Sequence, residues 1–226
     1  MRRHRSSTPG FTIVEIIVVI AILGVLAAVT IASYSNIKRN TRNVRTISTA
    51  TAYERALMTY LNKNNSYPAM DPNAGGVCLG IGYKDRVGGD GIGDCGETAW
   101  PLKEDTIFND SLKQLVSSLP IVNDTEVKMP YQSTTFVGAA FHYFPPDPTE
   151  PLPEDQGGFI VDGVSSPYYI MYVLEGGNQD CGNGNILATD DANGGWPRMT
   201  RKRPSGQHWT YSDNKATACV IYMPNP

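Results

Sequence analysis

The sequence predicts an α+β fold: a long N-terminal helix, with a transmembrane half and an amphipathic half, packed on a C-terminal antiparallel β-sheet head. Three observations predict it. No charged residue occurs from Ile16 to Ile37, and no proline occurs from Asn36 to Leu61. Short runs of β-branched and aromatic residues, bounded by Pro or Gly, follow in the C-terminal half of the chain.

The first element is the apolar run from Phe11 to Ala32. A helix rises about 1.5 Å per residue, so roughly 20 apolar residues cross the hydrocarbon core of a bilayer. One carboxylate, Glu15, lies inside the leading edge of this run. A charge in a membrane segment costs on the order of 2.5–3.5 kcal/mol, so we expect Glu15 to have a function.

A short basic leader precedes the apolar run. It contains three arginines and ends in Pro9-Gly10. A secretory signal peptide is cleaved after its apolar core, whereas this leader ends before the core. An ordinary membrane anchor requires neither Glu15 nor Pro9-Gly10. The order of a basic leader, Gly10, Phe11 and a hydrophobic helix with Glu15 resembles the precursor of a type IV pilin or of a related pseudopilin.

This resemblance implies a set of site residues. A prepilin peptidase would cut between Gly10 and Phe11, Phe11 would be N-methylated, and Glu15 would act in assembly. The resemblance is close over residues 1–37 and looser to about Pro68. The sequence has Ala32 where the family often has a proline, so details of the helix in a fibre that depend on that proline are not carried over.

Five segments are expected along the chain: a leader (1–10), a transmembrane or fibre-core helix (11–35), its amphipathic continuation (36–62), a loop region with a short helix (63–130), and an antiparallel sheet with a disulfide-bounded C-terminal region (131–226). The short helix is expected around Asp110–Leu119, capped by a residue from Asn109 to Ser111. The packed side of the continuation is expected to contain residues spaced by sevens and their neighbours: Ile37, Val44, Thr51, Met58, Ile47, Leu57 and Leu61. The strand-like runs are Thr134–Phe144, Gly158–Val161, Tyr168–Leu174 and Ala216–Met223.

The helix and the head are expected to differ in charge. The formal charge is −3, and without the leader 16 basic residues stand against 22 acidic ones. Basic residues cluster after the apolar run at Lys38, Arg39, Arg42 and Arg45, where they are expected to form a solvated helix face near lipid headgroups. The remaining head is acidic, which argues against general nucleic-acid binding. Arg201–Arg203 is the candidate for a DNA contact in a minority hypothesis.

Four cysteines lie beyond the apolar run: Cys78, Cys95, Cys181 and Cys219. An even number in an exported chain predicts two disulfides. Three pairings can be drawn, and proximity along the chain favours Cys78–Cys95 with Cys181–Cys219. The cysteines lack the spacing and the histidine partners of a zinc site.

No cofactor and no catalytic activity are predicted, because the sequence contains no established catalytic motif. Calcium is a weak alternative: Asp90 and Asp94 lie in a Gly-rich stretch with Asp85 and Glu97, and Asp190 and Asp191 lie in a second acidic cluster. A polar turn loop is the favoured interpretation of both.

The resemblance therefore implies a structural function. The chain would be a pilin, inserted in the cytoplasmic membrane as a single-pass precursor with its head outside, then cleaved, N-methylated and polymerised into an extracellular type IV pilus. Its partners would be further copies of itself, a prepilin peptidase/methyltransferase, and an assembly ATPase with its membrane platform. The alternative is a pseudopilin of a type II secretion or DNA-uptake system.

Overall fold

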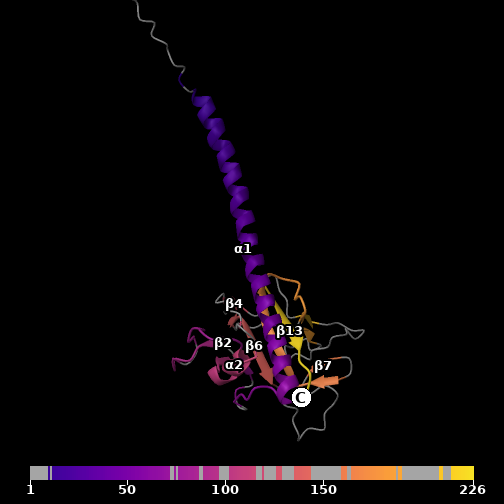
Figure 1. The fold of residues 1–226 in the computed structure, drawn as a ribbon. Helices are drawn as coiled ribbons and strands as arrows, with labels where there is room; N and C mark the ends of the chain where they lie inside the picture. Colours follow the sequence, from indigo (N-terminus) through magenta and orange to yellow (C-terminus); the bar gives the residue numbers. More distant parts are fainter. Residues whose placement is uncertain are drawn as a thin grey trace, which may run out of the picture. The chain divides into compact units, whose positions relative to one another are not determined.

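The computed structural model describes residues 10, 12–71, 74, 76–86, 89–96, 102–115, 119, 126–128, 135–143, 159–161, 164–186, 188–189, 209–210 and 215–226. The chain divides into two compact units, residues 1–41 and residues 42–226. A long helix is followed by a largely antiparallel sheet (Figure 1), so the predicted α+β class is confirmed.

Helix α1 covers Ile13–Asn64, which is 52 residues. It ends where the sequence changes to Asn and Ser. Asn65 adopts a left-handed conformation with φ of 53°, and its N–H donates to the carbonyl of Leu61 at 2.8 Å. This single-residue reversal closes the helix, because asparagine tolerates the left-handed region better than most side chains. The end of the helix between residues 62 and 68 was predicted from sequence and is confirmed.

Within the described residues, nine strands form one sheet in the order β10-β13-β9-β6-β1-β3-β2-β5-β4. All neighbouring strands are antiparallel except β1 and β3, which are parallel. The strands are β1 Gly76–Cys78, β2 Asp94–Gly96, β3 Leu102–Glu104, β4 Glu126–Lys128, β5 Thr135–Val137, β6 Ala139–Tyr143, β9 Tyr168–Glu175, β10 Asn185–Ile186 and β13 Ala216–Tyr222. Two further antiparallel pairs are β7 Phe159–Val161 with β8 Val164–Ser166, and β11 Ala188–Thr189 with β12 Trp209–Thr210.

Strand β9 lies between β13 and β6, and it has buried residues on each of its two faces. Alternate side chains of a strand point to opposite faces. Ile170, Tyr172 and Leu174 join a core with α1, whereas Tyr169 and Met171 join a second core on the other face. Strands β4 and β5, at the far end of the sheet, contact β9 and contribute to the second core. Both faces of the central strand are therefore covered by protein.

We call residues 42–226 the head unit and residues 1–41 the N-terminal unit. The part of α1 in the head unit packs on the first core through Ala50, Tyr53, Leu57 and Leu61. In Figure 1 this part of α1 crosses the strands β6 and β13. The predicted face was wrong in part. Val44 is 65% exposed and, in the N-terminal unit, Ile37 is 62% exposed. The buried face is extended toward the N-terminus by polar residues, namely Asn43, Thr46 and Thr49, and a hydrophobic pattern does not detect them.

The region from residue 63 to residue 130 contains strands β1 to β4 rather than only loops and a helix. These strands have three residues each, too short to show a period of two. Helix α2 covers Thr106–Lys113, earlier than the predicted helix around Asp110–Leu119. Its N-cap is Asp105, whose carboxylate accepts from the N–H of Phe108 at 2.9 Å. The expectation missed this because Ile107 is exposed and blurs the pattern.

Candidate functional site

The first turn of α1 holds Glu15 in a capping box with Thr12. One oxygen of the Glu15 carboxylate accepts from the backbone N–H and from the hydroxyl of Thr12, both at 2.8 Å. The Thr12 hydroxyl oxygen in turn accepts from the backbone N–H of Glu15 at 3.2 Å. This reciprocal arrangement satisfies donors that a helix start otherwise leaves open. Within one chain, the side chain of Glu15 therefore already has partners.

Gly10 is exposed, and apart from its chain neighbours no atom of the described residues lies within 4 Å of the position that a β-carbon would occupy. Phe11 lies outside the described residues. The structure thus places Gly10, Thr12 and Glu15 at one end of α1.

Beyond Glu15, α1 exposes a continuous apolar surface. Its large side chains are at least half exposed, for example Ile16 at 50% and Val29 at 62%. Within the described residues, α1 is the one helix long and apolar enough to cross a membrane by length and composition. Exposed apolar patches of this size need a cover. A bilayer or the same segment of other copies would supply one.

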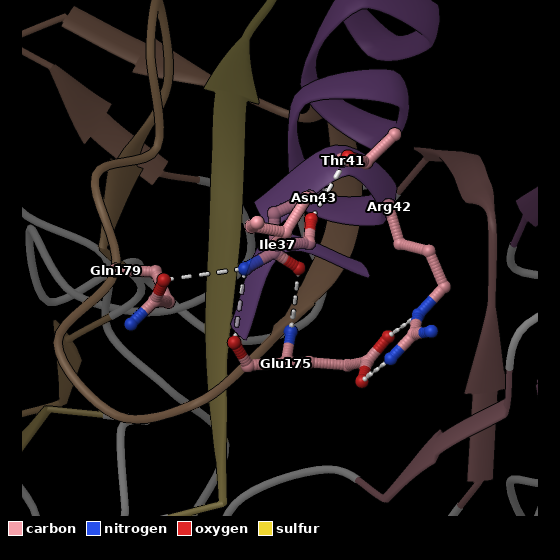
Figure 2. Close-up of polar contacts among 6 residues, drawn as sticks. All are labelled: Ile37, Thr41, Arg42, Asn43, Glu175 and Gln179. Carbon is pink, nitrogen blue, oxygen red and sulfur yellow. Dashed lines mark hydrogen bonds and ion pairs between the residues drawn. The ribbon is translucent and has the colours of Figure 1, made fainter. Parts of the chain in front are cut away.

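A second polar site fixes α1 to the sheet of the head unit. We call the residues Arg42, Asn43, Glu175 and Gln179 the helix clasp (Figure 2). The Asn43 carboxamide donates to the backbone carbonyl of Glu175 at 2.9 Å and accepts from the N–H of Glu175 at 2.9 Å. Its Nδ2 also donates to Gln179 Oε1 at 3.2 Å. Asn43 is 6% exposed, so these bonds satisfy a buried polar group.

Arg42 completes the clasp with a two-pronged ion pair. Its Nε and Nη2 atoms donate to the two carboxylate oxygens of Glu175, the second at 2.6 Å. The hydrogen bond to Glu175 raises the pKa of Arg42 above its ordinary value, so the guanidinium stays charged. The two side chains are 34% and 22% exposed, which leaves the pair partly screened by water.

The loop after β9 is attached to the sheet by the disulfide between Cys181 and Cys219, whose Cα atoms are 5.7 Å apart. The Gln179 N–H donates to the Thr217 hydroxyl at 3.0 Å, and the Tyr172 hydroxyl donates to the Cys181 carbonyl. A β-carbon on Gly182 would lie 2.6 Å from the Ile47 side chain on α1. Glycine at this position therefore lets the loop contact the helix directly.

The other disulfide joins Cys78 in β1 to Cys95 in β2. Both bonds are the pairings that proximity along the chain favoured. The described part of the chain contains no free cysteine.

The calcium candidates that the structure describes are occupied by protein groups. The Asp90 carboxylate pairs with Lys103 and accepts from the N–H of Ile92 at 3.0 Å. The Lys103 ammonium holds the pKa of Asp90 below its usual range. Asp94 is buried and accepts from the N–H of Arg86. Within the described residues no group of three His, Cys, Asp or Glu side chains could hold a metal ion.

Some predicted residues fall outside the described residues: Asp190, Asp191, Glu97 and the cationic Arg201–Arg203. The helix clasp, in contrast, was not predicted. Asn43 and Glu175 are 132 residues apart, and a single asparagine on an amphipathic helix carries no signal of its partner.

Comparisons with known proteins match the N-terminal segment alone. Residues 5–31 match the family model described as the prokaryotic N-terminal methylation motif. Neither a search of curated proteins nor a search of solved structures gave a significant match. The matched residues include Gly10, Phe11, Thr12 and Glu15, and the match ends within α1. Residues 5–31 thus carry the prepilin signature of type IV pilins and pseudopilins.

Proposed function

We propose that this chain is the precursor of a structural pilin, cleaved after Gly10, N-methylated at Phe11 and polymerised through α1 into a type IV pilus. The observation that supports this most strongly is the position of Glu15. It is the one acidic residue between the leader and Glu54, and it lies in the capping box directly before the exposed apolar surface. A plain membrane anchor has no use for a carboxylate at that place.

Polymerisation requires that the apolar surface of α1 leave lipid for a surface of similar polarity. The same helix of a neighbouring copy offers such a surface. Packing against it transfers the apolar side chains from lipid to protein, so they never contact water. Such contacts are non-directional and do not fix an axial offset. A charge pair between Glu15 and the Phe11 amine of a neighbouring copy would fix it, since a buried carboxylate is costly without a partner.

The proposed partners are a prepilin peptidase/methyltransferase, an assembly ATPase with its membrane platform, and further copies of the chain. The precursor would span the cytoplasmic membrane once, with the head outside. The acidic head would then coat the fibre surface. The methylation motif is shared by pilins and pseudopilins, so a pseudopilin of a secretion or DNA-uptake system is the alternative. A pilus subunit is recovered in sheared surface fibres, whereas a pseudopilin remains with the cell envelope.

Mass spectrometry of the mature chain tests the proposal. The expected N-terminal peptide begins with N-methyl-phenylalanine at position 11. Gly10→Val should leave the leader attached, because the peptidase must reach the backbone beside a residue without a side chain. Gly24→Val is the matched control within the apolar run, where a β-carbon also meets no atom within 4 Å. A mature chain that still begins at Met1 would refute processing at this site.

A further inference from the structure

Two cations that follow the apolar surface of α1 have no acidic partner among the described residues. Helix α1 has no acidic residue between Glu15 and Glu54, whereas Lys38 and Arg39 are adjacent. Lys38 is exposed, and its Nζ lies 5.3 Å from the centre of the Tyr34 ring. Arg39 is half-buried, and in the described part of the chain its shielded Nε has no hydrogen-bond partner. All three residues belong to the N-terminal unit, and no ion pair within the described residues includes either cation.

The spacing along α1 places these residues at a bilayer boundary. From Ile13 to Tyr34 the helical rise is roughly 30 Å, about the thickness of the hydrocarbon core. An aromatic ring with a polar tip favours that interface. Lys38 and Arg39 lie about 6–8 Å further along the helix, which is the depth of the headgroup layer.

We propose that Tyr34, Lys38 and Arg39 form a headgroup anchor that binds the phosphate of anionic phospholipids in the leaflet nearer the head. The two cations face the phosphate, and Tyr34 holds the Lys38 ammonium by a cation–π contact at the level of the ester groups. The anchor fixes the depth of α1 in the bilayer before assembly. The identity of that leaflet rests on the proposed function, but the binding of anionic lipid does not.

A carboxylate on a second copy is the competing partner for the same cations. The lipid is favoured because the cations follow an apolar surface of membrane length and have an aromatic residue between them and that surface. The acidic residue of the N-terminal unit is Glu15, which lies at the opposite end of the apolar surface. No described acidic residue of this unit therefore faces Lys38 or Arg39.

The test uses the full uncut chain in phosphatidylcholine vesicles that contain spin-labelled phosphatidylglycerol or spin-labelled phosphatidylcholine. The fraction of lipid immobilised by the protein gives the preference for the anionic lipid. Replacing both cations, by Lys38→Gln with Arg39→Gln, should lower this preference by about fivefold per cation. The charge-preserving exchange of Lys38→Arg with Arg39→Lys should retain it.

The matched control removes two other exposed cations of α1, by Arg55→Gln with Lys63→Gln. The anchor predicts an unchanged lipid preference in this control. Equal losses in the control and in the Lys38/Arg39 variant would overturn the proposal, because net charge alone would then explain them. An unchanged preference in the Lys38/Arg39 variant would overturn it as well.

Two further arms separate the sources of the anion. Inorganic phosphate should reduce the preference no more than chloride at equal ionic strength, and a larger effect of phosphate would show binding of the free ion instead of the lipid. Carbodiimide cross-links from Lys38 to a second copy in these vesicles would assign the cations to another subunit. The assay needs neither cleavage nor polymerisation, so a failure of the proposed pilin function leaves its result standing.

Discussion

The carboxamide of Asn43 on α1 pairs with both backbone groups of Glu175, the last residue of β9, at 2.9 Å each. This is the pattern that a neighbouring strand would supply. On one side of β9, Glu175 is paired with Ala216 of β13. On the other side, the neighbouring strand β6 pairs with β9 only as far as Tyr172, so no described strand pairs with Glu175 there. A helix side chain therefore replaces the missing strand at the end of β9.

The first prediction compares two substitutions in the helix clasp. Asn43→Ala should lower the free energy of unfolding by about 1–3 kcal/mol, because it leaves the part-buried backbone N–H and carbonyl of Glu175 without their side-chain partner. Arg42→Ala should cost less, about 0.2–1 kcal/mol, because water screens its ion pair. The measurement is thermal unfolding of the full chain in detergent, followed by near-ultraviolet circular dichroism.

Asn40→Ala serves as the control for the clasp, since Asn40 is exposed on the same helix. It should change the stability of the head by no more than about 0.5 kcal/mol. A larger effect from Arg42→Ala than from Asn43→Ala would mean that the charge, rather than the buried carboxamide, holds the helix.

The second prediction concerns Cys181 and Cys219, which are 38 residues apart. Closing a loop of this length is expected to stabilise the folded state by about 4 kcal/mol, against about 3 kcal/mol for the shorter loop of Cys78–Cys95. Replacing Cys181 and Cys219 by serine should therefore lower the melting temperature and speed hydrogen exchange at the Gln179 amide, whose partner Thr217 lies on β13. The control is the variant in which Cys78 and Cys95 are both replaced by serine, which should leave hydrogen exchange at the Gln179 amide unchanged. If the Gln179 amide stayed protected in the Cys181/Cys219 variant as well, the proposed role of the Cys181–Cys219 disulfide would be contradicted.

The third prediction concerns pH. The His142 ring stacks on Tyr169 with centroids 4.7 Å apart, and within the described residues its Nε2 has no hydrogen-bond partner. Burial lowers the pKa of His142 to about 4, below its ordinary value of 6.5. The unfolded chain then binds a proton more readily, so the contribution of His142 to stability is present above pH 6.5 and is lost as the pH falls toward 4.

Denaturant unfolding at a series of pH values measures this effect. Wild type should lose stability through that window more steeply than His142→Phe, with a difference of at most about 1.4 kcal/mol per pH unit. Acidic residues contribute to both proteins alike, so the difference between the two slopes isolates the histidine. Parallel slopes would show that His142 is neutral or charged equally in both states.

The fourth prediction separates the two roles of Glu15. Glu15→Gln retains a side chain able to complete the capping box but removes the charge. Thr12→Val removes the hydroxyl of the box and keeps the charge. If assembly depends on a charge pair with Phe11, Glu15→Gln and Glu15→Val should both insert in the membrane and fail to form fibres.

Thr12→Ser should behave as wild type, and Thr12→Val should give fibres at reduced yield because the helix start loses its cap. Fibre yield in cells without a wild-type copy is the measurement, and membrane fractionation checks insertion. Normal fibre yield from Glu15→Val would remove the charge pair from the mechanism.

Long elements could be predicted from the sequence because their pattern repeats within the element. The runs Tyr168–Leu174 and Ala216–Met223 correspond to β9 and β13, which cover Tyr168–Glu175 and Ala216–Tyr222. The run Thr134–Phe144 was expected as one strand, but Gly138, with a positive φ of 67°, divides it into β5 and β6. Its β-branched and aromatic residues do not reveal this break.

The elements and contacts that could not be predicted depend on pairing between residues far apart in the sequence. Val77 in β1 pairs with Lys103 in β3 in a parallel arrangement, and neither three-residue segment has a pattern of its own. The residues of the N-terminal signature are adjacent in sequence, so the motif was visible. The helix clasp joins residues more than 130 positions apart, and only the folded sheet brings Glu175 to Asn43.

The position of β13 in the sheet has a consequence for synthesis. This strand lies between β9 and β10, and 40 residues separate Glu175 from Ala216. At about 5–20 residues per second, β9 waits roughly 2–8 seconds for its partner after it has been translated. Throughout that interval one edge of a hydrophobic strand is open to other chains. The chain thus has an unpaired strand edge while it is being made, and the rate of translation sets how long this edge stays open.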